Sequence, residues 1–197
     1  MASDIKNVYV ELDGIIEWAK LFEHNRDQKG YNDAYVDTNG RTTVNFILDD
    51  DNLAKLKKTG SLKRGKPDPE GRGTSVKFDR KWETGRDWDS GAPAVYRVDG
   101  NPWNPQVDGE IGNGSIGRIQ LVVTYFPSVK TYSTRIEKVK VLEHVPYEGP
   151  TDPFKVDESG TVTAPQRSTT PTPTPPPMEE DLSDEIDAEA RTLEQKL

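Results

Sequence analysis

Hydrophobic and polar residues alternate over much of the first 147 residues, which is the pattern of strands with one buried face. The alternation is clearest after the glycine-rich segment 111–117, where every second residue from position 119 to 125 is apolar. The apolar face consists of Ile119, Leu121, Val123 and Tyr125. Because Gly112, Gly114 and Gly117 permit positive φ and close backbone approach, the segment predicts a central strand entered through a tight turn.

Further strands are predicted before this one. Residues 8–22 have the apolar weight of one long strand, with Asp13-Gly14 as either a bend or a hairpin turn. Segments 35–37 and 42–48 flank Asn39-Gly40, which is a type I′ hairpin signal. The N-terminal half is therefore expected to be rich in β-structure.

The second half of the body adds three strand candidates. Residues 74–82 alternate, with Val76, Phe78, Arg80 and Trp82 on one face, and residues 93–98 form a short strand after a turn. In residues 135–145 the apolar positions move from even to odd numbers, which predicts a β-bulge near Glu137-Lys138. Such a bulge helps an antiparallel sheet to curve toward closure.

A short helix is predicted over residues 52–60. Three aspartates at positions 49–51 precede it, lysines lie toward its end, and Gly60 terminates it. The aspartates could also suggest a metal site, but no EF-hand spacing follows, so we favour helix capping. Residues 65–73 hold two prolines and three glycines and are expected to form a mobile loop.

Composition divides the chain into three parts. The whole chain contains 26 Lys and Arg and 34 Asp and Glu. Residues 1–147 hold 22 basic and 22 acidic residues, so the net charge of −8 comes from residues 148–197. We expect one domain over residues 1–147, a Pro- and Thr-rich linker over 148–177, and a disordered acidic tail over 178–197 with a thin helical stripe. The predicted fold class is mainly β, with a short helix.

Several function classes lack support in the sequence. There is no nucleophile elbow, no phosphate-binding Gly-x-x-x-x-Gly-Lys motif and no cysteine, so we expect no catalytic residues and no enzyme. His24 and His144 are 120 residues apart without ligand spacing, so neither a metal nor another cofactor is expected. No long apolar run or signal peptide is present, which predicts an intracellular protein without membrane contact.

Nucleic-acid binding has a physical basis in residues 55–86, which contain eleven basic and four acidic residues. Single-strand binding needs cations for the phosphates and flat side chains on which bases stack. The candidate nucleic-acid-binding residues are Lys63, Arg64, Lys66, Arg72, Lys77, Arg80, Lys81, Trp82, Arg86, Trp88 and Arg118. Arg118 is included because it follows the glycine-rich turn, whose backbone amides could approach a phosphate.

The aromatic residues have two interpretations each. Phe78 is expected in the core, Trp82 is equally consistent with core and with stacking, and Trp88, between two aspartates, is expected to be exposed. Trp18 lies on an apolar strand and is expected in the core, whereas the sequence leaves Trp103 undecided.

The acidic tail is a candidate for partner contact or for competition with nucleic acid at the basic stretch; a solubilising appendage is the alternative. The candidate partner-binding residues are Glu179, Glu180, Asp181, Leu182, Asp184, Glu185, Ile186 and Leu193.

Together these features resemble bacteriophage single-stranded DNA-binding proteins. The resemblance rests on Trp18-Ala-Lys-Leu21, the basic strand ending at Trp82, Gly91-x-Pro93, Ile111-Gly-Asn-Gly-Ser115 and the acidic tail. It implies an OB-fold, a five-stranded Greek-key barrel that coats single-stranded DNA during phage replication, recombination and repair, in the host cytoplasm and commonly as a dimer. It also implies replication proteins, such as a polymerase or helicase-primase, as partners of the tail.

One feature departs from that family. Some members end in an aromatic residue that contacts replication partners, whereas this tail ends in Lys196-Leu197. We expect Leu182, Ile186 and Leu193 to supply the hydrophobic contact instead. The alternative to DNA binding is a β-sandwich structural or interaction module of a virion.

Overall fold

A computed structural model describes residues 6–86, 89–147 and 149. Within them, seven strands form a single sheet with the order β3-β4-β2-β1-β6-β7-β5. The strands are β1 (Lys6–Lys20), β2 (Arg41–Leu48), β3 (Gly65–Pro67), β4 (Thr74–Lys81), β5 (Ala94–Tyr96), β6 (Ser115–Phe126) and β7 (Thr131–Glu143). The helices are α1 (Asp50–Lys58) and α2 (Pro105–Asp108), with short 3₁₀ helices at Glu23–Asn25, Tyr31–Asp33 and Val36–Thr38.

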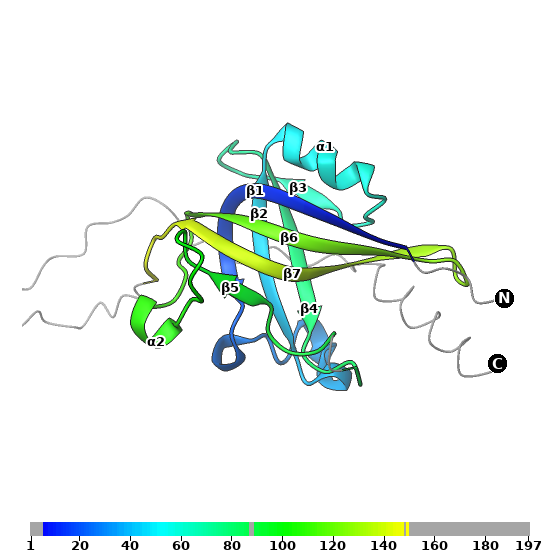
Figure 1. Ribbon diagram of the computed structural model, residues 1–197, viewed down its shortest axis with the longest axis horizontal. Coiled ribbons are helices and arrows are strands. Elements are labelled where there is room, and N and C mark those ends of the chain that lie inside the picture. Colours follow the sequence, from blue (N-terminus) through cyan, green and yellow to red (C-terminus); the bar gives the residue numbers. More distant parts are fainter. Residues whose placement is uncertain (1–5, 87–88, 148, 150–197) are drawn as a thin grey trace, which may run out of the picture.

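Five long strands curl toward a barrel. Because β1 is antiparallel to β2 and β6, and these are antiparallel to β4 and β7, the outer strands β4 and β7 run in the same direction and contact each other. Figure 1 shows β1, β6 and β7 as one layer that crosses β2 and β4, with α1 lying against β1. This arrangement is that of an OB-fold, a small, partly open Greek-key barrel, and it confirms the mainly β prediction. The short strands β3 and β5 extend the sheet at its two edges. All seven strands belong to one continuous sheet, whereas the alternative β-sandwich would consist of two.

β1 belongs to both layers. Its first eleven residues pair with β6, and residues from Ile15 onward pair with β2. Gly14 lies at this transition, where a Cβ atom would come within 2.6 Å of the backbone oxygen of Ile47. Asp13-Gly14 is therefore part of a bend within one strand and not a hairpin turn.

The core lies between the two layers. Phe46 of β2 and Phe78 of β4 are fully buried and meet edge to face, with ring centroids 6.4 Å apart. Ile119, Leu121 and Val123 are also buried, as the period-two pattern predicts. The bulge in β7 occurs at Glu137, since Gln120 pairs with Lys138 and Leu121 pairs with Ile136.

α1 forms for the expected reason. The Asp49 carboxylate accepts a hydrogen bond from the backbone N–H of Asn52 (2.7 Å), and Gly60 follows the helix with φ +84°. Asp49 therefore caps the helix, and Asp50 and Asp51 lie in its first turn.

Two local predictions are wrong. Asn39 and Gly40 do have positive φ, but residues 36–38 form a 3₁₀ helix, so no hairpin exists there. Residues 65–73 are predicted as a mobile loop, but they begin with β3, which pairs with β4, and the Asp68 carboxylate accepts hydrogen bonds from the backbone N–H groups of Glu70 and Arg72. The predicted linker and acidic tail, apart from Gly149, lie outside the described residues.

Candidate nucleic-acid interface

The outer surface of β1, β2 and β4 carries a row of polar side chains. In β4 the even-numbered residues from Val76 to Arg80 are buried, so the odd-numbered residues face outward. Strand pairing aligns Lys77 with Asn45, Asp79 with Thr43, and Lys81 with Arg41. On the other side of β2, Glu17 aligns with Asn45 and Lys20 with Thr43. We call these eight residues the β1–β2–β4 face: Glu17, Lys20, Arg41, Thr43, Asn45, Lys77, Asp79 and Lys81.

Asp79 forms the centre of this face. Its carboxylate accepts hydrogen bonds from Arg41 Nη1 (2.8 Å) and from Lys63 Nζ (2.6 Å). Burial raises the pKa of Asp79, but the charges and hydrogen bonds of Lys63 and Arg41 more than offset this, so its pKa lies well below the usual range. Two cations thus neutralise one carboxylate, leaving the group with a net positive charge.

Tyr35 packs over the cations from the loop that joins β1 to β2. The Arg41 guanidinium carbon lies 4.5 Å from the centre of its ring, and Lys77 Nζ lies 6.0 Å from it. Burial lowers the pKa of Lys77, and the nearby carboxylates of Asp27 and Asp79 partly offset this effect. Tyr35 is itself buried, so it positions these side chains and presents no open ring.

The cations of the face outnumber its carboxylates. Lys20 lies 3.8 Å from Asp27, a neighbour of the face that also acts on Lys77. With Lys63 and Asp27 added, the cationic groups are Lys20, Arg41, Lys63, Lys77 and Lys81, and the acidic groups are Glu17, Asp27 and Asp79. Between them, Asn45 is partly exposed and supplies a neutral hydrogen-bonding group, whereas Thr43 is buried.

Beyond β4, the β3 edge adds further predicted residues. Arg64 and Lys66 are exposed beside β4. Arg72 is instead tied to carboxylates, through Asp68 (2.9 Å) and Glu17 (3.0 Å). Asp68 hydrogen bonds raise the pKa of Arg72 above its ordinary value.

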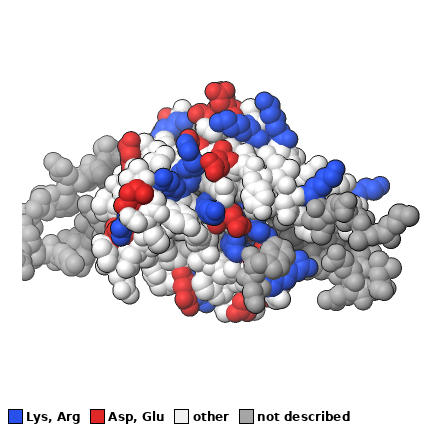
Figure 2. Space-filling model, viewed as in Figure 1, with Lys and Arg blue, Asp and Glu red and all other residues white. Residues whose placement is uncertain are grey.

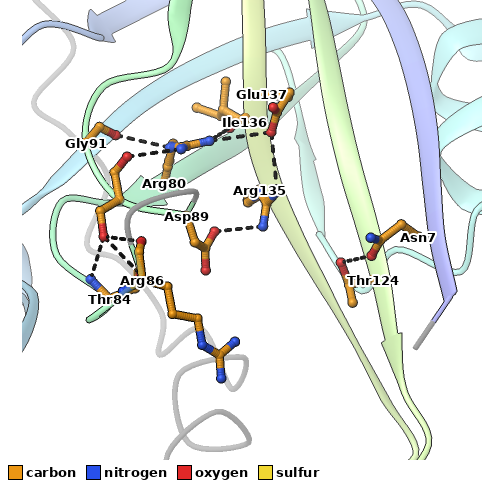
Figure 3. A network of polar contacts seen from close by, with 11 residues as sticks. Asn7, Arg80, Thr84, Arg86, Asp89, Gly91, Thr124, Arg135, Ile136 and Glu137 are labelled. Carbon is orange, nitrogen blue, oxygen red and sulfur yellow. Dashed lines mark hydrogen bonds and ion pairs between the residues drawn. The ribbon is translucent and has the colours of Figure 1, made fainter. Parts of the chain in front are cut away.

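Arg80 has a structural position (Figure 3). It faces inward on β4 and donates to the backbone oxygens of Gly91 (3.1 Å), Ser90 (3.1 Å) and Ile136 (3.2 Å). Glu137, at the β7 bulge, completes the network together with Arg135. The sequence placed Arg80 among candidate phosphate contacts, but its buried guanidinium joins the two edges of the barrel.

Trp82 continues the inward-facing row just past β4 and is partly buried. The Arg26 guanidinium carbon lies 4.6 Å from its ring centre, and carbonyl oxygens of Glu23 and Asn39 hold Arg26 there. One face of the Trp82 ring is therefore covered by a cation. Arg86 lies in the loop that follows, where its side chain points away from the Arg80 network (Figure 3), and Trp88 lies outside the described residues.

Arg118 lies away from the β1–β2–β4 face. It forms a two-pronged ion pair with Asp13 across β1 and β6, with distances of 2.6 and 2.9 Å. The preceding turn uses its amides internally, since Gly114 N–H donates to the Ile16 oxygen (3.0 Å) and Gly112 N–H to the Val145 oxygen (2.8 Å). These amides serve the junction of β1, β6 and β7.

Trp18 corrects another expectation. It is 49% exposed and lies at a bulge in β1, so it is not a core residue. Its apolar neighbours along the chain conceal this, because an inserted residue changes the register without changing composition. Trp103, by contrast, packs against the core, and its indole N–H donates to the Gly109 oxygen (3.1 Å).

The two histidines converge on Glu110. His24 bonds to the Glu110 carboxylate, and His144 Nε2 lies 3.1 Å from the Glu110 backbone oxygen. The sequence did not predict this contact, because the two histidines are 120 residues apart. A shallow cavity of about 480 Å³ adjoins it, lined by His24, Asn104, Pro105, Gln106 and Glu110. Among the residues that the structure describes, no cluster of three His, Cys, Asp or Glu side chains suits a metal ion.

Charges on the viewed face are interspersed (Figure 2), and acidic and basic groups both cover α1. Across residues 6–86, 89–147 and 149, no helix is long and apolar enough to cross a membrane.

The sequence matches no family model and no curated protein. Among solved structures, the chain is similar to the single-stranded DNA-binding protein from bacteriophage Enc34, with 15% identity, a TM-score of 0.45, and coverage of 74% of this chain and 87% of that one. The same protein in complex with ssDNA gives 13% identity, a TM-score of 0.45, and coverage of 73% and 89%. The single-stranded DNA-binding protein gp2.5 encoded by bacteriophage T7 gives 15%, 0.45, and coverage of 81% and 100%. These proteins are of the kind that the sequence motifs resemble.

Proposed function

We propose that this protein binds single-stranded DNA without base preference across the β1–β2–β4 face. The observation that carries the proposal is the concentration of five cationic groups against three carboxylates on and beside the outer surface of adjacent barrel strands. In OB-folds this surface and the adjoining loops bind oligonucleotides. The phosphates provide the sequence-independent part of such binding.

The charge arrangement supports phosphate binding despite the acidic residues. Asp79 is flanked by Arg41 and Lys63, so its negative charge is compensated where a phosphate would approach. Lys77 and Lys81 project from the same side of β4. Asn45, the one residue of β2 that is partly exposed, can donate to phosphate or sugar oxygens between the cations.

The proposed path extends to Arg64 and Lys66 at the β3 edge, and to Trp82 and Arg86 at the far end of β4. Arg72 can join it only by exchanging its contacts with Asp68 and Glu17 for a phosphate. The motif resemblance gives the biological setting of the proposal: coating of exposed strands in phage replication, recombination and repair. The acidic tail would contact replication proteins or compete for this face, and the protein would act without catalysis and possess the family's tendency to dimerise.

Binding of fluorescent oligo-dT, followed by anisotropy with unlabelled duplex DNA as competitor, tests the proposal. We expect oligo-dT to compete far better than duplex. The double variant Lys77→Gln/Lys81→Gln should weaken binding at least tenfold, from about 1.5 kcal/mol for each charged contact. The matched control is Lys138→Gln/Lys140→Gln, which removes two outward-facing lysines from β7. Equal loss in both variants, or equal preference for duplex, would overturn the proposal.

A further inference from the structure

Trp18 combines an exposed ring with an unfavourable backbone. Its φ is 51°, in the left-handed region that bulky residues rarely adopt. The other non-glycine residues with positive φ in the described chain are Asn32, Asp33, Asn39 and Lys130. Asn and Asp tolerate this region, and glycine is the usual occupant of a left-handed bulge position. A tryptophan is thus unexpected here on grounds of backbone stability alone.

The glycine-rich turn holds Trp18 in place. The Trp18 backbone N–H donates to Asn113 Oδ1 (2.7 Å), and the adjacent Gly114 N–H donates to the Ile16 oxygen (3.0 Å). Contacts from a segment 95 residues away in the sequence therefore fix the chain where the bulge begins. Strained residues that the surroundings fix in this way are concentrated at binding sites.

The bulge lies at the margin of the β1–β2–β4 face. Glu17 pairs with Asn45 and Lys20 pairs with Thr43, so Trp18 and Ala19 are inserted between two rows of that face. Ala19 packs against the core, whereas the side chain of Trp18 stays half exposed. Lys20 is close enough to Lys77 to influence its pKa, which links the bulge to the cations of β4.

We propose that Trp18 is a base-stacking residue of the single-strand site and that Asn113 is its positioning residue. The inference rests on the proposed function and adds to it the group that contacts a base. A flat ring beside a row of cations is what a single strand requires, because phosphates and bases alternate along it. The bulge provides this ring at the cost of a left-handed backbone.

A pair of oligonucleotides of equal length and charge, one oligo-dT and one made of abasic sites, separates stacking from phosphate binding. Trp18→Leu should lower the affinity for oligo-dT roughly 5- to 150-fold and leave the affinity for the abasic strand unchanged. The control is Tyr9→Leu, which removes another exposed aromatic ring from β1 and should change neither affinity. Trp18→Gly should show the same loss of oligo-dT binding with an unfolding temperature close to that of the wild type, since glycine suits the backbone.

The outcomes are distinguishable. If the wild type binds neither oligonucleotide, the proposed function itself fails. If the wild type binds both and Trp18→Leu binds oligo-dT as tightly as the wild type does, or loses affinity for both strands equally, only the assignment of Trp18 fails.

Asn113 is tested through the ratio of the affinity for oligo-dT to the affinity for the abasic strand. Asn113→Ala removes the acceptor and should reduce the preference for oligo-dT over the abasic strand. Asn113→Asp keeps an oxygen that can accept the Trp18 N–H and should restore the preference. A merely structural role would change the unfolding temperature and not this ratio, and an unchanged ratio in Asn113→Ala would overturn the positioning role.

Discussion

The guanidinium of Arg80 on β4 donates a hydrogen bond to the backbone oxygen of Ile136 on β7, at 3.2 Å. This contact spans the two strands between which the barrel closes. Arg80 is 7% exposed, and burial lowers its pKa, although Glu137 partly offsets the effect. An arginine that the sequence suggests for DNA contact thus stabilises the fold.

Replacing Arg80 should therefore reduce stability. Arg80→Met leaves the carbonyl oxygens of Gly91, Ser90 and Ile136 without this donor, while Glu137 keeps its contact with Arg135. It should lower the free energy of unfolding by about 3 kcal/mol in urea denaturation. The comparison is Arg118→Met, which breaks an exposed ion pair with Asp13 and should cost under about 1 kcal/mol. Similar losses in the two variants would contradict the closing role of Arg80.

The depressed pKa of Asp79 predicts a pH dependence. A carboxyl whose folded pKa lies below its unfolded value of about 3.9 adds stability at higher pH, which is lost as the pH falls below roughly 5 toward the folded pKa. Asp79→Asn should lower the free energy of unfolding by about 3 kcal/mol at pH 7, because Arg41 and Lys63 lose their shared partner. The difference from the wild type should shrink progressively as the pH is lowered.

Denaturation series from pH 7 to pH 2 measure this effect. Glu70→Gln is a suitable control, since its carboxylate is largely exposed. A constant difference between Asp79→Asn and the wild type over the whole range would show that Asp79 does not carry the acid dependence.

The glycine-rich turn predicts a contrast between neighbours. A Cβ atom at Gly112 would lie 2.7 Å from the Val145 oxygen, whereas nothing lies within 4 Å of one at Gly114, whose φ is +87°. Gly112→Ala should cost about 3 kcal/mol by overpacking, and Gly114→Ala about 1 kcal/mol through its left-handed backbone. Thermal denaturation of both variants checks the order, and a reversed order would contradict the packing described for this turn.

Much of the fold follows from local patterns. Asp49 and Gly60 delimit α1, and the change of parity after Ile136 locates the bulge in β7. The alternation that buries Val76 and Phe78 also places Arg80 inside, so the sequence already contained the signal for its structural role. These features depend on residues near one another in the chain.

The rest depends on contacts between distant segments. Trp18 is exposed because the bulge, fixed by Asn113, changes the register of β1, and apolar weight alone indicated the core. The neutralisation of Asp79 by Arg41 and Lys63 requires β2 and the segment before β3 to meet at β4. Such pairing has no signature in a single sequence, which is why charge counting overestimated the free cations of residues 55–86.

The acidic tail gives a further prediction. Removing residues 178–197, which contain eight acidic and two basic residues, should strengthen oligo-dT binding at low salt if the tail competes for the cationic face. A tail of equal length with its acidic residues changed to Asn and Gln is the control and should behave like the deletion. Unchanged affinity in both would leave the tail without a contact to this face.

The salt dependence of oligo-dT affinity tests the central claim most directly. For the wild type, the logarithm of the association constant should fall linearly with the logarithm of salt concentration, with a slope of about 0.7 per phosphate neutralised. Lys77→Gln/Lys81→Gln should reduce that slope by about 1.4, while Lys138→Gln/Lys140→Gln leaves it unchanged. A flat dependence for the wild type, or an unchanged slope in Lys77→Gln/Lys81→Gln, would contradict DNA binding on the β1–β2–β4 face.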